Sequence, residues 1–407
     1  MRILFLTITR INDISERHIY TDLIRKFRDE GHEIYTVCTS ERRNKEKTNY
    51  ALIDKVHLLK VWTLNAQKTT LFEKGLCTLL IDKQFLKSIK KYFYNIHFDL
   101  ILYSTPPVTF IKTISYFKSK HKATTYLLLK DIFPQNAVDL GLIKKNGLIY
   151  SYFRKKEKKL YNISDYIGCL SSANVNYILK HNNSVNPKNV EINPNSISPI
   201  ELSYSKDLKY LVRKKYNIPS NSIVFIYGGN IGKPQGIDFV LEVLSKNIGD
   251  EKIFFIIVGS GTEFPKIYKW YQKENPNNIL VLPGVNKLDF DELISVCDVG
   301  LIFLDKRFTI PNIPARLLSY LENKMPILAA TDINTDIGKI IEEAGCGFWV
   351  ESNNIYEYNK YLQKFKLEPN IIESMGNKSY ELLKKNYLID VSYKKIVEKL
   401  HLKTNHH

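Results

Sequence analysis

Apolar and polar positions alternate along this chain with two periods. Short runs of consecutive apolar residues predict buried strands, and the segments between them carry apolar residues at helical spacing. In the segment His18–Glu30, for example, Tyr20, Leu23 and Phe27 fall on one face of a helix. Strands that alternate with helices are typical of a parallel sheet covered by helices. The pattern therefore predicts an α/β fold.

The predicted strands form two series. The first is Arg2–Thr9, His32–Thr39, Asp99–Thr105, Ala123–Asp131, Asp165–Ser171 and Val190–Asn193. The second is Ile223–Tyr227, Ile253–Val258, Ile279–Leu282, Val299–Leu304, Ile327–Ala330 and Phe348–Val350. The polar, proline-containing segment 193–205 between them is interpreted as a linker. We predict two Rossmann-like domains that face each other across a cleft, with ligands at the carboxyl ends of the strands.

The length of the chain, 407 residues, exceeds what one hydrophobic core usually organises. We predict one domain over 1–195 and a second over 196–385. The five cysteines are scattered without a C-x-x-C pair, which is typical of buried thiols in a reducing compartment. The first apolar run is too short for a signal peptide, and no window approaches the ~20 apolar residues of a membrane span. We therefore expect a cytoplasmic protein.

The net charge of +17 is unevenly distributed. Residues 1–195 contain 32 Lys and Arg against 17 Asp and Glu, whereas residues 196–407 contain 27 against 25. A basic first domain suggests an anionic partner, either phospholipid or nucleic acid. A generally lysine-rich composition is the alternative explanation.

The clearest candidate for chemistry is the glycine-rich segment Tyr227–Asp238, which closes a predicted strand and opens a predicted helix. Gly229, Gly232 and Gly236 allow a loop backbone to direct free N–H groups at an anion, and the helix dipole adds to the attraction. A diphosphate fits such a site. Glycine turns also join strands to helices for structural reasons alone, so the neighbouring loops decide between the two interpretations.

Three further loops follow strands of the second series. They are Val258–Gly261, Pro283–Val285 and Thr309–Arg316. Arg316 falls in the first turn of the next predicted helix, where its guanidinium can bind phosphate as a fork or simply be solvated. Four loops of this kind at one sheet edge favour a ligand site.

The sequence Asp289-Phe290-Asp291 is formally a D-x-D, the pattern that some nucleotide-sugar enzymes use to hold a metal. Here it begins a predicted helix Asp289–Cys297, and acidic residues are favoured in a first helical turn without any metal. We therefore predict no metal. The sequence also contains no H-E-x-x-H, Walker A or G-x-S-x-G motif, which disfavours zinc hydrolases, P-loop kinases and serine esterases.

Taken together, these motifs resemble family-4 glycosyltransferases of the GT-B fold, especially those that build bacterial capsule and O-antigen polysaccharides. The resemblance covers essentially the whole chain. It rests on RHIYTDLIRKFRDEGHEIYTV (17–37), FDLILYSTPPVTF (98–110), LLLKDIFPQNAVDLGLI (127–143), INPNSISP (192–199), YGGNIGKPQG (227–236), IIVGSGTE (256–263) and NIPARLLSYLENKMPILA (312–329). It also implies that a C-terminal helix over 386–407 crosses back to the first domain.

The resemblance implies that the second domain binds the donor nucleotide-sugar. The donor contacts would come from Gly229, Asn230, Gly232, Lys233, Gly259, Ser260, Gly261, Gly284, Val285, Asn312, Ile313, Arg316 and Ser319. On the acceptor side, the candidates are Thr9, Arg10, Ser104 and Pro106. The predicted catalytic residues are Lys233 and Arg316, which would stabilise the departing diphosphate, and Asp131, which would position the transferred sugar or be only a structural cap.

The chain departs from the family pattern at two places. The family's pair of glutamates aligns with Pro311 and Ser319, and the usual Arg and Lys after the first glycine loop align with Asn230 and Gln235. Ser319 would then replace a charged ribose contact. Lys233 and Arg316 would be the remaining cations for the diphosphate.

The resemblance implies a retaining transfer, without metal or cofactor, from a nucleotide-sugar to a lipid-linked saccharide in surface polysaccharide biosynthesis, with UDP favoured. The basic first domain would rest on the inner, anionic membrane face. Two basic segments could make this contact. One is 83–93, where Lys83, Lys87, Lys90 and Lys91 lie among Phe85, Leu86, Ile89 and Phe93, and the other is 154–159. The alternatives are a nucleotide-sugar epimerase of the same architecture and, less favoured, a nucleic-acid-binding protein, for which no motif is present.

Overall fold

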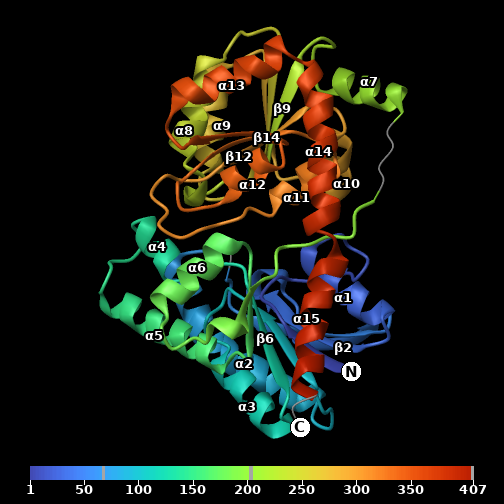
Figure 1. The fold of residues 1–407 in the computed structure, drawn as a ribbon, viewed down its shortest axis with the longest axis vertical. Coiled ribbons are helices and arrows are strands. Elements are labelled where there is room, and N and C mark those ends of the chain that lie inside the picture. The colour runs from blue at the N-terminus through green and yellow to red at the C-terminus, as the bar shows by residue number, and fades with distance from the viewer. Residues whose placement is uncertain (67–68, 201–204, 405–407) are drawn as a thin grey trace. The chain divides into compact units, whose positions relative to one another are not determined.

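The computed structural model describes residues 1–66, 69–200 and 205–404. The chain forms two compact units (Figure 1). Unit 1 comprises Met1–Ser198 and Leu388–His407, and unit 2 comprises Pro199–Tyr387. Residues 201–204 of the predicted linker and 405–407 of the predicted C-terminal helix lie outside the described residues.

Unit 1 is built on one sheet, with the strand order β3-β4-β2-β1-β5-β6-β7-β8. Neighbouring strands are parallel except β3 and β4, which form an antiparallel hairpin that the sequence pattern did not predict. The strands are β1 (Arg2–Leu6), β2 (Glu33–Glu41), β3 (Asn49–Ile53), β4 (Val56–Thr63), β5 (Leu100–Ser104), β6 (Thr124–Leu129), β7 (Tyr166–Cys169) and β8 (Val190–Ile192).

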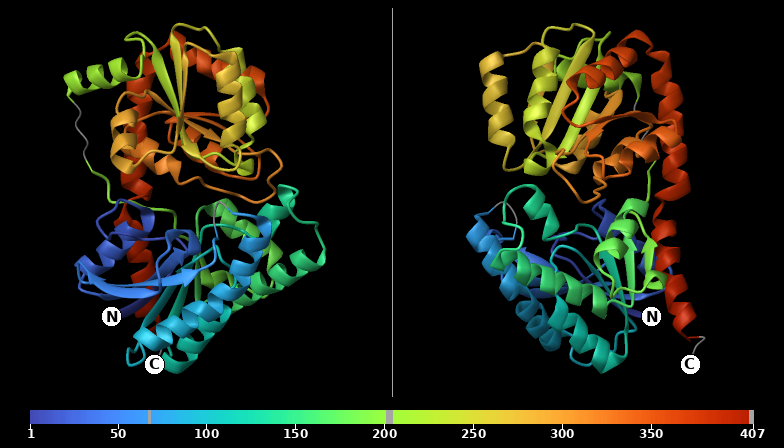
Figure 2. Two further views of the ribbon diagram at one scale, coloured as in Figure 1. Left: turned by 180° about the vertical axis from the view of Figure 1, so that it is seen from behind. Right: turned by 60° about the vertical axis from the view of Figure 1, so that its left-hand side comes forward.

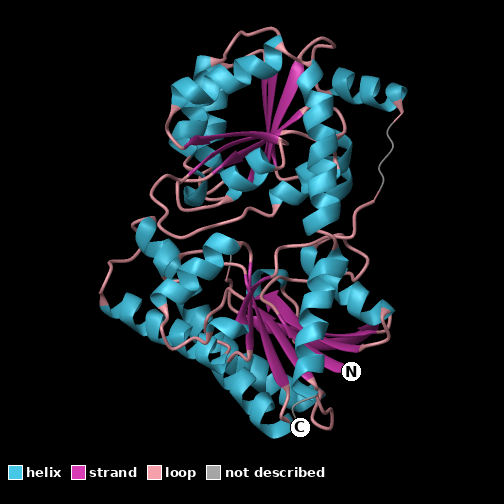
Figure 3. Cartoon of the chain, viewed as in Figure 1, coloured by secondary structure: helices cyan, strands magenta, loops and turns pink. Residues whose placement is uncertain are grey.

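Helices cover both faces of this sheet (Figures 1 and 3). They are α1 (Ile19–Asp29), α2 (Leu71–Tyr92), α3 (Ile111–His121), α4 (Gln135–Asp139), α5 (Leu148–Ile163), α6 (Ser172–His181) and α15 (Ile389–Thr404). The predicted stripe of α1 is buried, because Leu23 and Phe27 pack in one core with Phe5 of β1 and Ile396 of α15. The C-terminal helix therefore completes the core of unit 1.

The segment before Ser198 ties α15 to the sheet. The side chain of Asn193 donates to the hydroxyl of Tyr126 on β6 at 2.9 Å and accepts from the hydroxyl of Ser392 on α15 at 2.7 Å. The N–H of Ile389 donates to the carbonyl of Ile197 at 2.9 Å. These bonds join three segments that lie far apart in the sequence, so the INPN motif has a structural role.

Unit 2 is built on an entirely parallel sheet, with the order β11-β10-β9-β12-β13-β14. Its strands are β9 (Ile223–Asn230), β10 (Ile253–Ser260), β11 (Ile279–Pro283), β12 (Val299–Phe303), β13 (Ile327–Thr331) and β14 (Gly347–Glu351). Its helices are α7 (Lys206–Lys215), α8 (Ile237–Lys246), α9 (Phe264–Glu274), α10 (Lys287–Ile294), α11 (Arg316–Glu322), α12 (Ile337–Glu343), α13 (Ile355–Leu367) and α14 (Asn370–Asn386). Figure 2 shows the helices on both faces of this sheet.

The strand order of each sheet reverses once, and ligands of such sheets bind beside the point of reversal. In unit 1 the reversal lies between β1 and β5, and in unit 2 it lies between β9 and β12. Loops that follow the strands diverge at such a point and leave a crevice at the carboxyl ends. In unit 2 the two loops touch, because the N–H of Asp305 after β12 donates to the carbonyl of Pro234 after β9 at 2.9 Å. Two Rossmann-like α/β domains are therefore confirmed.

The predicted membrane helix of unit 1 needs one correction. Phe85, Ile89 and Phe93 of the α2 segment are core residues, with at most 3% of their surface exposed. The amphipathic pattern was correct, but its aromatic face packs against the sheet and cannot reach a lipid surface. Among the described helices, none is long and apolar enough to cross a membrane.

Candidate functional site

The strand β9 carries its glycines to the edge of the unit 2 sheet. It continues through Gly229 to Asn230, which pair with Gly259 and Ser260 of β10. The prediction that β9 ends at Tyr227 and that these glycines lie in loops is therefore wrong. A Cβ atom on Gly259 would lie 1.9 Å from the carbonyl oxygen of Gly229, so the two backbones can approach this closely only where glycine stands.

The loop after β9 is closed by its own hydrogen bonds. The N–H of Gly232 donates to Oε1 of Gln235 at 2.9 Å, and the N–H of Gly236 donates to the carbonyl of Lys233 at 3.2 Å. The expectation of free N–H groups at Gly232 and Gly236 is therefore wrong. The loop instead forms a fixed turn that leaves the side chain of Lys233 exposed.

Two amides occupy the positions where the family resemblance led us to expect cations. The Nδ2 of Asn230 donates to Oε1 of Gln235 at 3.0 Å, and the same oxygen accepts the N–H of Gly232. The side chain of Gln235 is buried. Both amides hold the turn together, so these two positions carry no charge.

Arg316 supplies a cation at the same edge. It is the first residue of α11, and its Cζ lies 4.1 Å from the ring centroid of the buried Tyr227. Its Nη2 donates to the carbonyl of Asn230 at 3.3 Å. Its Nη1 is buried and has no hydrogen-bond partner within the described part of the chain. A buried donor without an acceptor costs free energy, so the geometry is well suited to an anionic ligand.

The helix that carries Arg316 is anchored by Tyr320. The hydroxyl of Tyr320 lies 3.1 Å from the carbonyl oxygens of both Ile226 and Leu301, and it donates to one of them. Its ring fills space that Gly300 leaves, since a Cβ at that position would lie 2.3 Å from Cγ of Tyr320. The start of α11 is therefore held against β9 and β12, which fixes the backbone from which the guanidinium projects.

The predicted donor residues at the ends of β10 and β11 lie around the paired glycines of β9 and β10. A Cβ on Gly261 would lie 2.2 Å from the carbonyl oxygen of Ile231, so Gly261 also serves close packing. Gly284 lies beside Ser260, whose Oγ would be 3.4 Å from a Cβ at position 284. The side chain of Val285 is 36% exposed. Contacts of these residues with a nucleoside stay a prediction.

The loop between β12 and α11 contains the other predicted donor residues. The carbonyl of Asn312 accepts a hydrogen bond from Oγ1 of Thr335 at 2.8 Å. Ile313 and Pro311 are buried, whereas Ser319 on α11 is half-buried. Proline at position 311 and serine at position 319 leave this stretch without the carboxylates that the family resemblance led us to expect.

The D-x-D motif lies at the start of α10. The helix begins at Lys287 and ends at Ile294, not at the predicted Asp289–Cys297. Asn286 caps it, donating to the carboxylate of Asp289 at 2.7 Å and accepting its N–H, while Asp291 contacts Lys287. Across the described residues, no group of three or more His, Cys, Asp or Glu could hold a metal ion.

Asp131 follows β6 at the carboxyl edge of the unit 1 sheet. Both of its carboxylate oxygens accept hydrogen bonds from Nδ2 of Asn136 on α4, at 2.9 and 2.7 Å. Its carbonyl accepts from Oγ1 of Thr105 at 3.1 Å. Burial raises the pKa of the Asp131 carboxyl to about 6. The structure thus holds a protonatable carboxyl in a fixed position at this edge.

The predicted acceptor-side residues lie after β1 and β5 of unit 1. Arg10 forms an ion pair with Glu46, with 2.7 Å between Nη2 and Oε1. Ser104 is buried at the end of β5, and Thr9 is half-buried. Pro106 is exposed. Of these four residues, Pro106 has the largest exposed fraction, and Ser104 would need a rearrangement before it could contact a saccharide.

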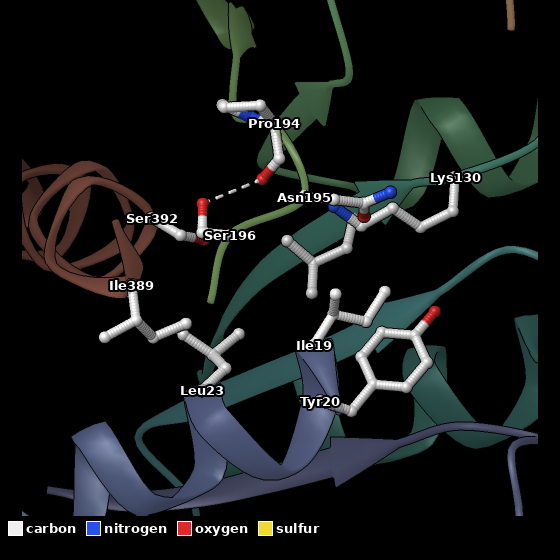
Figure 4. A pocket seen from close by; sticks show the side chains of 10 residues that line it. Ile19, Tyr20, Leu23, Lys130, Pro194, Asn195, Ser196, Ile389 and Ser392 are labelled. Carbon is white, nitrogen blue, oxygen red and sulfur yellow. Dashed lines mark hydrogen bonds between the residues drawn. The ribbon is translucent and has the colours of Figure 1, made fainter. Parts of the chain in front are cut away.

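A small cavity of about 10 Å³ lies at the same end of unit 1, and the sequence analysis missed it (Figure 4). Side chains from α1, the end of β6, the segment after β8 and the start of α15 line it. They are Ile19, Tyr20, Leu23, Leu128, Lys130, Pro194, Asn195, Ser196, Ile389 and Ser392. This volume accommodates about one water molecule or one polar group of a ligand.

Burial affects two polar side chains of the cavity. Burial lowers the pKa of the Lys130 ammonium to about 7. Asn195 is 9% exposed, and its Oδ1 has no hydrogen-bond partner among the residues described. Lys130 follows the apolar run of β6, and a lysine at the end of a buried strand could have marked it in the sequence. Its proximity to Asn195 depends on the path of the chain after β8, which no sequence pattern near Lys130 predicts.

Comparison with known proteins indicates the enzyme class of the chain. Residues 210–382, which lie within unit 2, match the family model "Glycosyl transferases group 1". The chain carries a group 1 glycosyltransferase domain. A probable glycosyltransferase, WbjE of Pseudomonas aeruginosa, is 23% identical over 339 residues, covering 81% of this chain and 80% of that protein. A putative colanic acid biosynthesis glycosyl transferase, WcaI of Escherichia coli, is 24% identical over 224 residues, covering 54% of each chain.

Solved structures share the fold of the whole chain. Sucrose-phosphate synthase from Thermosynechococcus elongatus matches with a TM-score of 0.74 and 11% identity, covering 99% of both chains. HepE of Anabaena in complex with UDP-glucose matches with a TM-score of 0.71 and 12% identity, covering 98% of this chain and 99% of that one. The architecture is that of GT-B glycosyltransferases. The enzyme class of this protein is therefore glycosyltransferase, and an epimerase is not favoured.

Proposed function

We propose that this protein is a retaining, metal-independent glycosyltransferase of the family-4 type that transfers a sugar from a nucleotide-sugar to a lipid-linked saccharide. The donor would be a UDP-sugar, and the pathway would be capsule or O-antigen biosynthesis. The group 1 domain and a relative named for colanic acid biosynthesis support this proposal. The observation that carries it is the Nη1 of Arg316, a buried donor without a partner in the described residues, at the switch point of the unit 2 sheet.

The proposed chemistry centres on the leaving group. Cleavage of a sugar–phosphate bond places negative charge on the departing diphosphate, so preorganised donors at that position lower the barrier. Arg316 is held by Tyr227 and Asn230, and Lys233 projects from the adjacent turn. We propose that these two cations bind the diphosphate. The neutral amide pair Asn230–Gln235 shapes the turn between them.

Asp131 is the proposed sugar-positioning residue of unit 1. A carboxyl whose pKa is about 6 is mostly ionised at neutral pH and can accept a hydrogen bond from a sugar hydroxyl. Its oxygens are already bonded to Asn136, which orients the group. We assign it no nucleophilic role, because the proposed retaining transfer occurs by attack on the same face of the sugar.

Donor consumption across a panel of nucleotide-sugars, with and without membrane lipid extract, tests this function. We expect one UDP-sugar to be consumed rapidly only when the extract is present, with release of UDP and labelling of the lipid fraction. Conversion of the nucleotide-sugar into an isomer without extract would identify an epimerase instead. Consumption of no member of the panel beyond slow hydrolysis, with extract present, would contradict the proposed donor class.

The same assay tests metal independence. Activity is expected to persist after treatment with EDTA, because the D-x-D carboxylates are engaged at the start of α10 by Asn286 and Lys287. The assay is repeated with Mn²⁺ added back after the chelator is removed. Activity that disappears with EDTA and returns with Mn²⁺ would show that the proposal of a metal-free site is wrong.

A further inference from the structure

The first turn of α5 exposes apolar side chains that no described element covers. The exposed fractions are 92% for Leu148, 60% for Ile149 and 42% for Tyr152. Leu148 and Tyr152 are neighbours on the helix surface because they are four residues apart, and Ile149 lies in the same first turn as Leu148. Single exposed apolar residues are common, but three of them at one helix end form a patch.

The helix α2 exposes a second set in its N-terminal half. The exposed fractions are 83% for Phe72, 40% for Leu76, 52% for Leu79 and 39% for Leu80. The spacing i, i+4, i+7 and i+8 places them on one stripe. The same stripe continues with exposed lysines, Lys83 and Lys87. The exposed face of α2 therefore changes from apolar to basic along the helix.

Both apolar sets belong to the same edge of unit 1. The helices α2 and α5 each pack against α3, and each connects two parallel strands of the sheet (Figure 2). In such a connection the helix runs antiparallel to its strands, so its N-terminal end lies toward the carboxyl ends of the strands. That edge also carries Asp131 and the cavity beside Lys130. We call the seven apolar residues of α2 and α5 the apolar tip.

Basic residues flank the apolar tip within the sequence. Lys144 and Lys145 precede α5, and further lysines follow Tyr152 on the same helix, namely Lys155, Lys156, Lys158 and Lys159. The Nζ of Lys156 lies 5.3 Å from the ring centroid of Tyr152. The acidic residue of this stretch, Glu157, is buried and paired with Arg154 at 2.5 Å, so it does not neutralise the exposed lysines.

We propose that the apolar tip inserts into an anionic bilayer, with the flanking lysines at the level of the lipid phosphates. Apolar side chains of this kind enter the boundary between headgroups and acyl chains, and basic neighbours add attraction to anionic lipid. A second copy of this chain is a poorer occupant, because pairing would bring the two lysine sets together. The insertion goes beyond sugar transfer, and it would bring the carboxyl edge of unit 1 to the membrane surface.

Vesicle sedimentation of the full chain tests the insertion without any turnover. The vesicles are phosphatidylcholine alone or phosphatidylcholine with phosphatidylglycerol, at low and high salt. We expect wild type to prefer the anionic vesicles, and the double variant L148S/I149S to bind them at least about tenfold more weakly, since each lost apolar side chain removes more than a factor of ~3. The matched control is Y356S/L367S on α13, whose residues are 78% and 75% exposed. It is expected to bind like wild type.

A second variant tests insertion without relying on the weaker binding of L148S/I149S. L148W places an indole at the tip, and its emission, after subtraction of the wild-type spectrum, should shift to the blue with anionic vesicles and be quenched by brominated acyl chains. Equal wild-type binding to both vesicles, unchanged binding of L148S/I149S, or an indole that is not quenched would each overturn the proposal. Absence of binding to either vesicle would also overturn it and would leave the tip to a protein partner. Donor consumption measured on the same preparations separates these outcomes from failure of the proposed sugar transfer.

Discussion

The carboxyl edge of the unit 1 sheet carries partly buried titratable side chains, whereas the corresponding edge of unit 2 is built from glycines, amides, one exposed lysine and one arginine. In unit 1, burial moves the pKa of Lys130 down to about 7 and that of Asp131 up to about 6. In unit 2, Gly229 and Gly259 bring two backbones together, and Arg316 provides a guanidinium cation. The same architecture therefore presents two different kinds of edge.

This difference indicates a division of labour. A donor diphosphate keeps its charge throughout the neutral range, so a site with a permanent cation binds it independently of pH. A site that handles sugar hydroxyls gains from groups that titrate near neutral pH, because such groups can donate or accept a proton. We therefore expect changes in unit 2 to alter turnover at every pH and changes at the unit 1 edge to depend on pH.

The largest effect is expected for Arg316→Ala. Removal of one preorganised charge-stabilising donor costs about 2–4 kcal/mol of transition-state stabilisation, which corresponds to about 30- to 1,000-fold in kcat/KM. Steady-state kinetics with the donor found in the panel measures this. Lys273→Ala is the matched control, since this lysine is 81% exposed at the end of α9. Donor turnover within about threefold of wild type would show that Arg316 does not contact the phosphates.

A smaller effect is expected for Gly259→Ala, and it should appear in stability. The new Cβ would lie 1.9 Å from the carbonyl oxygen of Gly229, so β9 and β10 would have to separate. Overpacking of this kind costs about 1–3 kcal/mol or more. Urea denaturation measures the loss. The control is Gly75→Ala on α2, where nothing lies within 4 Å of a Cβ, and which should not destabilise the protein. Equal stability of the two variants would contradict the close approach of the strands.

The edge of unit 2 also shows what the sequence could predict. The apolar runs predicted the parallel strands except β4, because burial on both faces leaves a local signal. The end of β9 was misplaced, because glycine is typical of turns, whereas Gly229 here extends a strand that pairs with Gly259. Which glycines approach each other is a property of strand pairing, and a single strand carries no information about it.

Site residues were likewise predictable only where the signal was local. The family resemblance pointed to Arg316, and its placement at the start of α11 agrees with the predicted helix. The hydrogen bond between Asn230 and Gln235 was not predicted, since it depends on the conformation of the turn. Lys130 was missed because Asn195, which lines the same cavity, is contributed by a distant segment. Contacts within one element were predictable, and contacts between elements were not.

The smallest effects are expected at the unit 1 edge, where their pH dependence tests the comparison. The folded pKa of Lys130 lies below its ordinary value of 10.5, so burial of the ammonium costs stability below pH ~7 and nothing above pH ~10.5. Lys130→Met should therefore stabilise the protein at pH 6, and the gain should shrink toward zero as the pH approaches 10.5.

Asp131→Asn should show the opposite dependence. The folded pKa of Asp131 lies above its ordinary value of 3.8, so burial of the carboxylate costs stability above pH ~6 and nothing below pH ~4. The gain from Asn, on the order of 1 kcal/mol, should therefore be present at pH 8 and absent at pH 4. Urea denaturation across this range measures both variants, with Arg316→Ala as the reference whose effect on stability stays constant. If the stability effects of Lys130→Met and Asp131→Asn were as independent of pH as that of Arg316→Ala, the two edges would not differ as the structure indicates.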